Sequence, residues 1–198
     1  MKDGTFGAAA EASALTQDVI DRIEEHRFEP LSHLFWRNPD LKTTSLDALI
    51  YSLNVRPTLP GLVGARKAED QQALESLARD TGIVRLTNHA SRVRLLWEIC
   101  QIPDFRKVTP EAHARLLAQI YRLILDKGRL PQDWFEKQVK MLDNTNGDID
   151  VVTGRIAGIR IWTYIAQRKE WIDRSAYWRD MTRAVEDRLS DALHQKSA

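Results

Sequence analysis

The chain has 198 residues, of which 43% are hydrophobic and 29% are charged, and its formal net charge is +1. This composition is typical of a folded globular protein with one or two cores and argues against a disordered chain. The near-zero net charge argues against a nucleic-acid binder that works by overall charge alone. No apolar run approaches the roughly 20 residues needed to cross a bilayer, so we expect a cytoplasmic protein with no membrane partner.

Few residues have the spacing of a metal or redox site. Cys100 is the only cysteine, which excludes a disulfide within the chain and favours a reducing compartment. The five histidines lack the spacing of metal ligands, so we expect surface or capping roles for them. The segment Asn144–Asp150 is similar to a calcium loop, but aligning Gly147 with the invariant glycine puts Leu142 at the first ligand position. We interpret the segment as an interhelical turn in which Asp148 caps the next helix.

Charge is distributed unevenly along the chain. The first fifty residues are acidic, whereas the segment Arg155–Arg183 carries seven basic residues against three acidic ones. Arginine outnumbers lysine, which suits bidentate contacts with phosphate. Genome base composition produces the same bias, and charged helix faces are often only solvated. A phosphate-binding surface and a merely solvated surface therefore both stay open as interpretations of this segment.

Apolar residues recur at helical spacing through the first half of the chain. This spacing predicts helices at 16–26, 45–53, 67–80 and from Asn88 to Pro103. Ser45 and Asn88 are the expected caps of the second and fourth helices, and Gly82 is the expected stop of the third. The proline-containing segment 28–44 is predicted to be a long extended connector packed along the helices.

The second half has clearer helix boundaries. Thr109 and Pro110 provide a cap and a first-turn proline, which predicts a long helix from 109 to about 125. Further helices are predicted at 131–142, 148–167 and 175–193, and short connections favour antiparallel packing in the more compact part of the chain. Gly154 and Gly158 form a small-xxx-small pair that predicts close helix packing. We therefore expect an all-α, irregular multi-helix bundle of about eight helices.

Six tryptophans are a high number for this length. Three of them lie at the spacing of core residues and are assigned to packing, namely Trp97, Trp134 and Trp162. Trp36 lies in an irregular stretch, while Trp171 and Trp178 lie beside basic residues. Such an aromatic ring can stack a nucleobase or be covered by a neighbouring arginine, and the second is the simpler interpretation.

Several longer motifs resemble one protein family. The chain is similar, over essentially its whole length, to the region after the arginine-rich sixth motif of superfamily II helicases of the Suv type, the degradosome RNA helicases, and of their bacterial relatives. The motifs that carry this resemblance are Met1–Gly7, Arg27–Leu31, Trp36–Asn38, Leu95–Lys107, Asn146–Asp150 and Glu186–His194. They are motifs of a helical domain and contain no catalytic chemistry.

The resemblance implies a helicase that hydrolyses ATP with Mg²⁺ between two RecA-like domains and threads a strand past this helical region. The phosphate loop, the acidic magnesium motif and the arginine-rich motif are absent from this sequence, so we expect no active site and no cofactor in this chain itself. The implied partners are single-stranded RNA, or DNA in its place, the RecA-like core of the same protein and a ribonuclease. Residues 1–15 are then expected to be the tail of a preceding RecA-like domain, with one helical subdomain at 16–108 and a second at 109–198.

Two functions from different classes remain. The first is an accessory domain that contacts the nucleic-acid strand, with six candidate phosphate contacts: Arg92, Arg94, Arg106, Lys107, Arg155 and Arg160. The second is a helical protein-interaction module that docks a helicase core or a ribonuclease through exposed aromatic residues. Binding by phosphate contacts weakens steeply with salt, whereas binding by an apolar surface does not.

Overall fold

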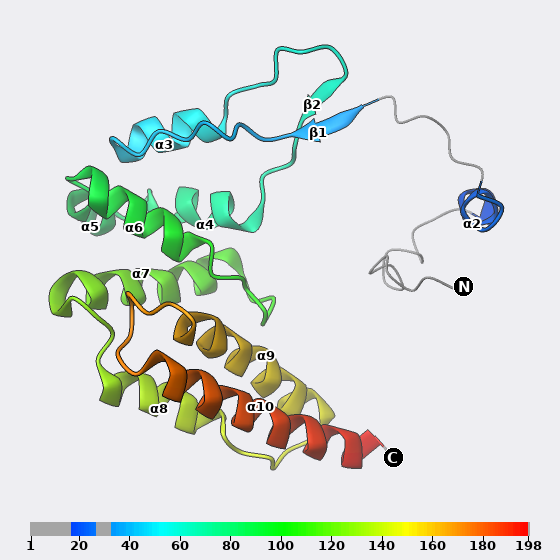
Figure 1. Cartoon of the computed structure of the whole chain (residues 1–198), viewed down its shortest axis with the longest axis vertical. Coiled ribbons are helices and arrows are strands. Elements are labelled where there is room, and N and C mark those ends of the chain that lie inside the picture. Colours follow the sequence, from blue (N-terminus) through cyan, green and yellow to red (C-terminus); the bar gives the residue numbers. More distant parts are fainter. Residues whose placement is uncertain (1–16, 27–32, 198) are drawn as a thin grey trace.

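The computed structural model describes residues 17–26 and 33–197, and over these residues it is dominated by helices (Figure 1). The predicted all-α fold is confirmed, with nine helices and one sheet of two parallel strands in the described part. In chain order the elements are α2 (Gln17–Glu24), β1 (Leu34–Trp36), α3 (Leu46–Leu53), β2 (Leu62–Gly64), α4 (Glu69–Leu77), α5 (Thr81–Leu86), α6 (Ala90–Cys100), α7 (Pro110–Lys127), α8 (Gln132–Leu142), α9 (Ile149–Ala166) and α10 (Ser175–Ser197).

Helix α2 lies between two stretches outside the described residues, 1–16 and 27–32. The predicted tail at 1–15, residue 16 at the start of the predicted first helix, and the motif Arg27–Leu31 therefore lie outside the described part of the chain. The helix ends at Glu24, two residues before the predicted end, and His26 follows in the left-handed region with a φ of 56°.

The predicted extended connector is described only from residue 33, and part of it is a strand. Strand β1 pairs in parallel with β2, so that Leu34 lies opposite Leu62 and Trp36 lies opposite Gly64. The backbone N–H of Leu34 donates to the Gly61 carbonyl oxygen at 2.9 Å, and helix α3 forms the crossover between the strands. Aromatic residues favour strands, but the partner strand is distant in sequence, so the sequence did not predict the pairing.

Helix α3 begins as predicted. The hydroxyl of Ser45 accepts a hydrogen bond from the backbone N–H of Ala48 at 3.0 Å, which satisfies one of the unpaired donors at a helix start. The apolar residues Leu46, Leu49 and Leu53 are buried. This small helix therefore attaches the N-terminal part of the described chain to the core.

The prediction for the third helix was wrong at its end. Helix α4 ends at Leu77, and Gly82 lies inside the additional helix α5. The Asp80 carboxylate caps α5 by accepting hydrogen bonds from the N–H groups of Gly82 and Ile83 at 2.8 and 3.3 Å. A Cβ atom at Gly82 would lie 3.0 Å from Asp80 Oδ1, so this glycine makes room for a cap at a helix start.

Helix α6 also begins differently from the prediction. Its N-cap is His89, whose side chain makes no capping bond, and the predicted cap Asn88 instead accepts a hydrogen bond from Arg92. Helix α7 agrees with its prediction at the start: Thr109 Oγ1 accepts a hydrogen bond from the N–H of Ala112 at 3.2 Å.

Helices α8, α9 and α10 form a bundle in which α9 and α10 pack along each other. An aromatic cluster fills it: the ring centroid of Phe135 lies 5.4 Å from that of Trp162 and 5.0 Å from that of Trp178. Trp97 and Trp162 are buried as predicted, and Trp134 is partly buried against the core. Large aromatic rings bury much apolar area, and these rings belong to the core of the described chain.

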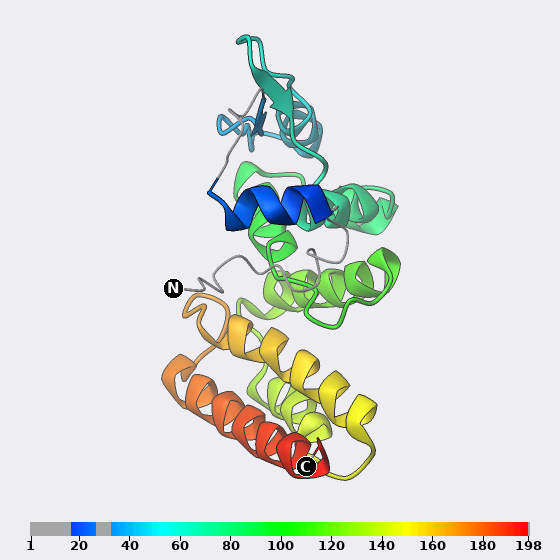
Figure 2. The same cartoon turned by 90° about the vertical axis from the view of Figure 1, so that its right-hand side faces the viewer.

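The elements are stacked along the long axis of the molecule. Figures 1 and 2 show α3 and the two strands at one end, α4 to α6 next, α7 across the middle and α8 to α10 at the other end. Helix α7 packs against α4 and α6, and one cluster of buried apolar residues extends from α3 to α10. Helix α7 begins directly after the predicted subdomain boundary at 108/109 and packs against α4 and α6, which precede that boundary. The boundary itself stays a prediction. Within the described residues, no helix is both long and apolar enough to span a membrane.

Candidate nucleic-acid interface

The six predicted phosphate contacts lie in three places. They come in pairs from α6, from the turn after α6 and from α9, and they are Arg92 and Arg94, Arg106 and Lys107, and Arg155 and Arg160. A cation can contact a strand only if its charge is accessible and is not already used by a partner in the fold. Their partners in the structure therefore separate the six residues.

Arg92 is half-buried and supports the start of α6. Its Nη1 donates to Asn88 Oδ1 at 3.2 Å, and its own carbonyl oxygen accepts a hydrogen bond from Tyr121 Oη at 3.1 Å. Burial raises the pKa of Tyr121 to about 12, so the phenol stays a donor at neutral pH. These contacts make Arg92 a link between α6 and α7.

Lys107 is exposed, but its charge is paired. Its Nζ lies 2.7 Å from Glu69 Oε1 of α4, and this hydrogen bond raises the pKa of Lys107 and lowers the pKa of Glu69. The partner comes from another helix because the turn after α6 packs beside α4. Lys107 also has a left-handed φ of 53°.

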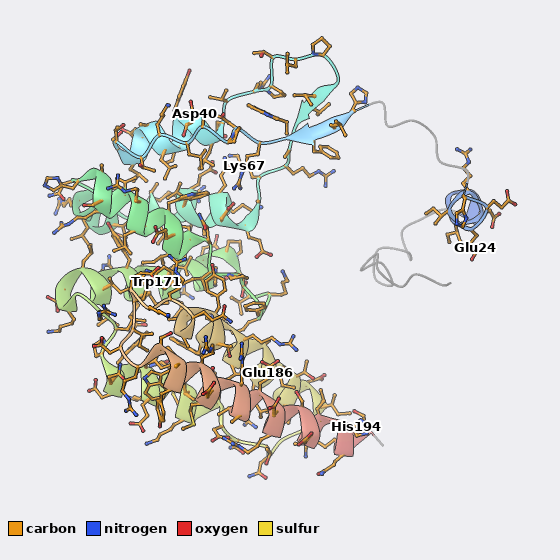
Figure 3. All side chains as sticks on the ribbon, viewed as in Figure 1. Glu24, Asp40, Lys67, Trp171, Glu186 and His194 are labelled. Atoms are coloured by element: carbon orange, nitrogen blue, oxygen red, sulfur yellow. The ribbon has the colours of Figure 1, made fainter. Side chains whose placement is uncertain are left out.

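The two arginines of α9 also have partners. Arg155 Nη1 donates to the carbonyl oxygen of Asn144 at 2.7 Å and to that of Asn146, and so fixes the turn before α9. Arg160 Nε lies 2.7 Å from Glu186 Oε1 on α10, where Figure 3 labels Glu186. Both residues serve the packing of the C-terminal bundle.

Arg94 and Arg106 are exposed, and within the described residues neither has a hydrogen-bond or ion-pair partner. Arg106 borders a hollow of about 170 Å³ between α8 and α9, where Gly154 and Gly158 lie. Of the six predicted residues, these two present a charge that a phosphate could use.

A second set of cations lies where the sequence did not predict a site. A groove of about 550 Å³ opens between the segment after α3 and strand β2, and the charged side chains that line it in the described structure are all basic: Arg37, Arg56, Arg66 and Lys67. We call this the basic groove. Figure 3 labels Lys67 where the chain passes from β2 toward α4. Trp36 also lines it.

Two of the four cations in the basic groove are neutralised. Arg37 Nη1 lies 2.8 Å from Asp70 Oδ1, and Lys67 Nζ lies 2.9 Å from Glu75 Oε2. Arg56 and Arg66 are exposed and have no such partner among the described residues. The basic groove therefore has a net positive charge at neutral pH.

The basic groove was missed because its residues are dispersed in sequence. Arg56 and Arg66 lie in irregular segments without helical spacing, beside Pro57 and Gly64. Trp36 joins them only because β1 pairs with a strand that begins 26 residues after it. One indication is present in the sequence, namely a tryptophan in an irregular stretch followed by arginine, but these two residue types alone do not define a groove.

The other two undecided tryptophans belong to the core. Trp171 and Trp178 are 1% and 4% exposed, so neither offers a face to a nucleobase. Arg168 covers the ring of Trp171 with its guanidinium carbon 4.4 Å from the ring centroid. Trp178 Nε1 donates to Gln132 Oε1 at 2.6 Å. The simpler interpretation, a ring covered by an arginine, is confirmed for Trp171, whereas Trp178 packs against the rings of Phe135 and Tyr177.

One histidine differs from its prediction. His113 is buried, where we expected a surface or capping role, and its Nε2 lies 2.9 Å from the Ile102 carbonyl oxygen. Its Nδ1 lies 3.9 Å from Asp104 Oδ1, also buried. Within the described residues no three side chains of His, Cys, Asp or Glu cluster as metal ligands would. Cys100 is buried, and burial raises the pKa of its thiol.

Comparison with protein-family models, curated proteins and solved structures gave no match to this chain.

Proposed function

We propose that this chain is the C-terminal accessory domain of a cytoplasmic, ATP-dependent RNA helicase of the Suv type, and that it contacts the single strand. The observation that carries the proposal is the basic groove, in which Arg56 and Arg66 present unneutralised charge beside an aromatic ring. The family resemblance of the motifs supports the same function. Arginine suits this role because its planar guanidinium makes bidentate bonds to phosphate.

The ATPase core belongs to the RecA-like domains of the parent protein. Phosphoryl transfer needs a phosphate cradle, a metal-holding acid and a positioned arginine, and the sequence contains no motif that supplies them. ATP and Mg²⁺ are therefore cofactors of the parent helicase, and this domain forms one wall of the path that the strand follows. Loss of the domain is expected to weaken coupling of hydrolysis to unwinding more than hydrolysis itself.

The test is the salt dependence of RNA binding by the 198-residue chain. Affinity for a labelled 20-nucleotide single strand is measured by fluorescence anisotropy over a range of KCl concentrations. Each phosphate contact to a single strand makes the slope of log affinity against log salt more negative by about 0.7. Contacts by Arg56 and Arg66 alone therefore predict a slope of about −1.4, and further contacts would make it steeper. Absence of binding at low salt would reject the proposed function.

An exposed apolar surface favours a second function, docking of a protein partner. Phe35 is 79% exposed, and Val63 lies beside it in the strand register and is 39% exposed. A two-stranded sheet is marginally stable alone, and a face with exposed apolar residues suits contact with another protein surface. The candidates are the RecA-like core and a ribonuclease. A complex that depends on Phe35 and weakens little with salt would support this function instead.

A further inference from the structure

The two faces of the small sheet differ. Successive side chains along a strand point to opposite faces, so Trp36 and its register partner Gly64 share one face, while Phe35 and Val63 share the other. Trp36, Leu62 and Gly64 of the first face line the basic groove, and Val63 of the other face also borders it. Trp36 is half-buried and is one of the residues that line the groove.

The place opposite Trp36 is open. A Cβ atom built on Gly64 would have no atom within 4 Å, although in a sheet this position normally lies beside the partner's side chain. The φ of Gly64 is outside the left-handed region, so the backbone conformation does not require glycine here. The glycine leaves space beside an aromatic ring.

One backbone position of β2, at Gly64, points to the open edge of the two-stranded sheet. Leu34 N–H bonds to the Gly61 carbonyl, and Ala65 N–H bonds to the Trp36 carbonyl at 2.9 Å. Because hydrogen bonding alternates along a parallel strand, the N–H and C=O of Gly64 point away from β1. The Gly64 N–H is therefore a hydrogen-bond donor two residues before Arg66 in the chain.

We propose that the basic groove binds one unpaired nucleotide, with its base stacked on Trp36 in the space beside Gly64 and its flanking phosphates on Arg56 and Arg66. The proposal rests on the proposed function, that the single strand passes this domain, and it names the contact site. A volume of about 550 Å³ can hold such a group, since ligand sites range from about 300 to 1,000 Å³.

The observations favour a nucleotide over an acidic peptide. Arg56 and Arg66 would pair with either kind of anion. The space beside Trp36 distinguishes them, because an aromatic face with room next to it suits a flat base, and every base presents such a face. A paired base is already stacked within its duplex, so the site selects single strands.

The test compares five variants of the full chain, one of them the double variant Arg56→Glu with Arg66→Glu, each first checked for an unchanged circular dichroism spectrum and melting temperature. Trp36→Ala removes the stacking face, Trp36→Phe keeps a smaller one, and Gly64→Val fills the space beside it with a residue that favours strands. Binding is measured by anisotropy with a labelled 12-nucleotide single-stranded DNA and with the same strand made abasic. Arg85→Glu, at an exposed arginine of α5 outside the basic groove, is the matched charge control and should bind both strands like the wild type.

The expected result depends on the base. Stacking on an aromatic side chain contributes about fivefold to 150-fold in affinity per base, so Trp36→Ala and Gly64→Val should each weaken binding of the normal strand at least about fivefold. Trp36→Phe should keep most of the affinity. None of the three should change binding of the abasic strand, whereas Arg56→Glu with Arg66→Glu should weaken both strands and flatten the salt slope by about 1.4.

The outcomes separate this inference from the proposed function. If the wild-type chain binds the strand but Trp36→Ala and Gly64→Val bind it equally well, the nucleotide site is wrong and the function stands. If Trp36→Ala weakens both strands equally, the ring has a structural role only and the inference fails. If an oligoglutamate peptide displaces the strand and itself loses affinity in Gly64→Val, the basic groove is a peptide site.

Discussion

Individual arginines on this surface have different tasks, and their partners show which. Arg155 donates two hydrogen bonds to backbone carbonyls of the turn before α9, whereas Arg160 pairs with a carboxylate across two helices. A guanidinium that satisfies backbone acceptors leaves them unpaired when it is removed. An ion pair between partly exposed side chains contributes less, because water screens it.

This difference gives a prediction for a matched pair of variants. Arg155→Ala should lower the free energy of unfolding by about 1–2 kcal/mol, while Arg160→Ala should lower it by less than about 1 kcal/mol. Urea denaturation followed by circular dichroism measures both. Equal losses for the two variants would mean that the bonds to the turn contribute no more than a surface ion pair.

The residue types alone could not show which of the six predicted cations are paired within the fold and which are accessible to a phosphate. Exposure and neutralisation depend on which acid packs nearby, and Glu69 is 38 positions from its partner Lys107 in sequence. Arg94, Arg106 and Lys107 are all exposed, and the sequence could not show that Lys107 is the one paired with an acid. It missed Arg56 and Arg66 because no helical periodicity marks their segments.

Among the elements, helix α9 contains two glycines that are equivalent in sequence but differ in packing. Gly154 has no atom within 4 Å of a Cβ position, whereas a Cβ on Gly158 would lie 3.0 Å from Leu142 Cδ2 of α8. The predicted close packing through a small-xxx-small pair is therefore made at Gly158 and not at Gly154. Glycine within a helix costs about 0.5–1 kcal/mol relative to alanine unless it allows a close approach.

Alanine at each position should then act in opposite ways. Gly154→Ala should raise the free energy of unfolding by about 0.5–1 kcal/mol, because it removes backbone freedom from the unfolded chain without a clash. Gly158→Ala should gain nothing or lose stability, because Leu142 must move. Guanidinium denaturation of both variants checks this, and equal stabilisation would contradict the close contact between α8 and α9.

Helix starts were predictable where a side chain caps the backbone. Ser45, Thr109 and Asp148 all accept the expected hydrogen bond from a backbone N–H. The prediction failed around Gly82, because the same residue type ends one helix or allows a cap at the next, and local sequence does not decide between them. The two-stranded sheet was missed because its pairing is not local.

Considered as a whole, the described molecule has one continuous apolar core. Helix α7 lies between the groups α4–α6 and α8–α10, and buried residues connect all of them. A shared core couples the stability of the parts on either side, since opening one exposes apolar area of the other. The molecule should therefore unfold as one unit over these helices.

A test compares two probes of thermal or urea unfolding. Tryptophan fluorescence reports mainly on the C-terminal bundle, where Trp134, Trp162, Trp171 and Trp178 lie, while circular dichroism at 222 nm reports on all helices. The two transitions should coincide within error. A fluorescence transition at clearly different urea concentration would show that the bundle unfolds separately, as two independent subdomains would.

The most direct test of strand contact is to map where RNA lies on the chain. A single-stranded RNA containing 4-thiouridine is bound to the 198-residue protein, crosslinked with light, and the attached peptides are identified by mass spectrometry. We predict crosslinks within residues 33–67, with Trp36 among the modified residues, and their loss in the double variant Arg56→Glu with Arg66→Glu. Crosslinks confined to α8–α10, or none above the level of an unrelated helical protein, would contradict the basic groove as the path of the strand.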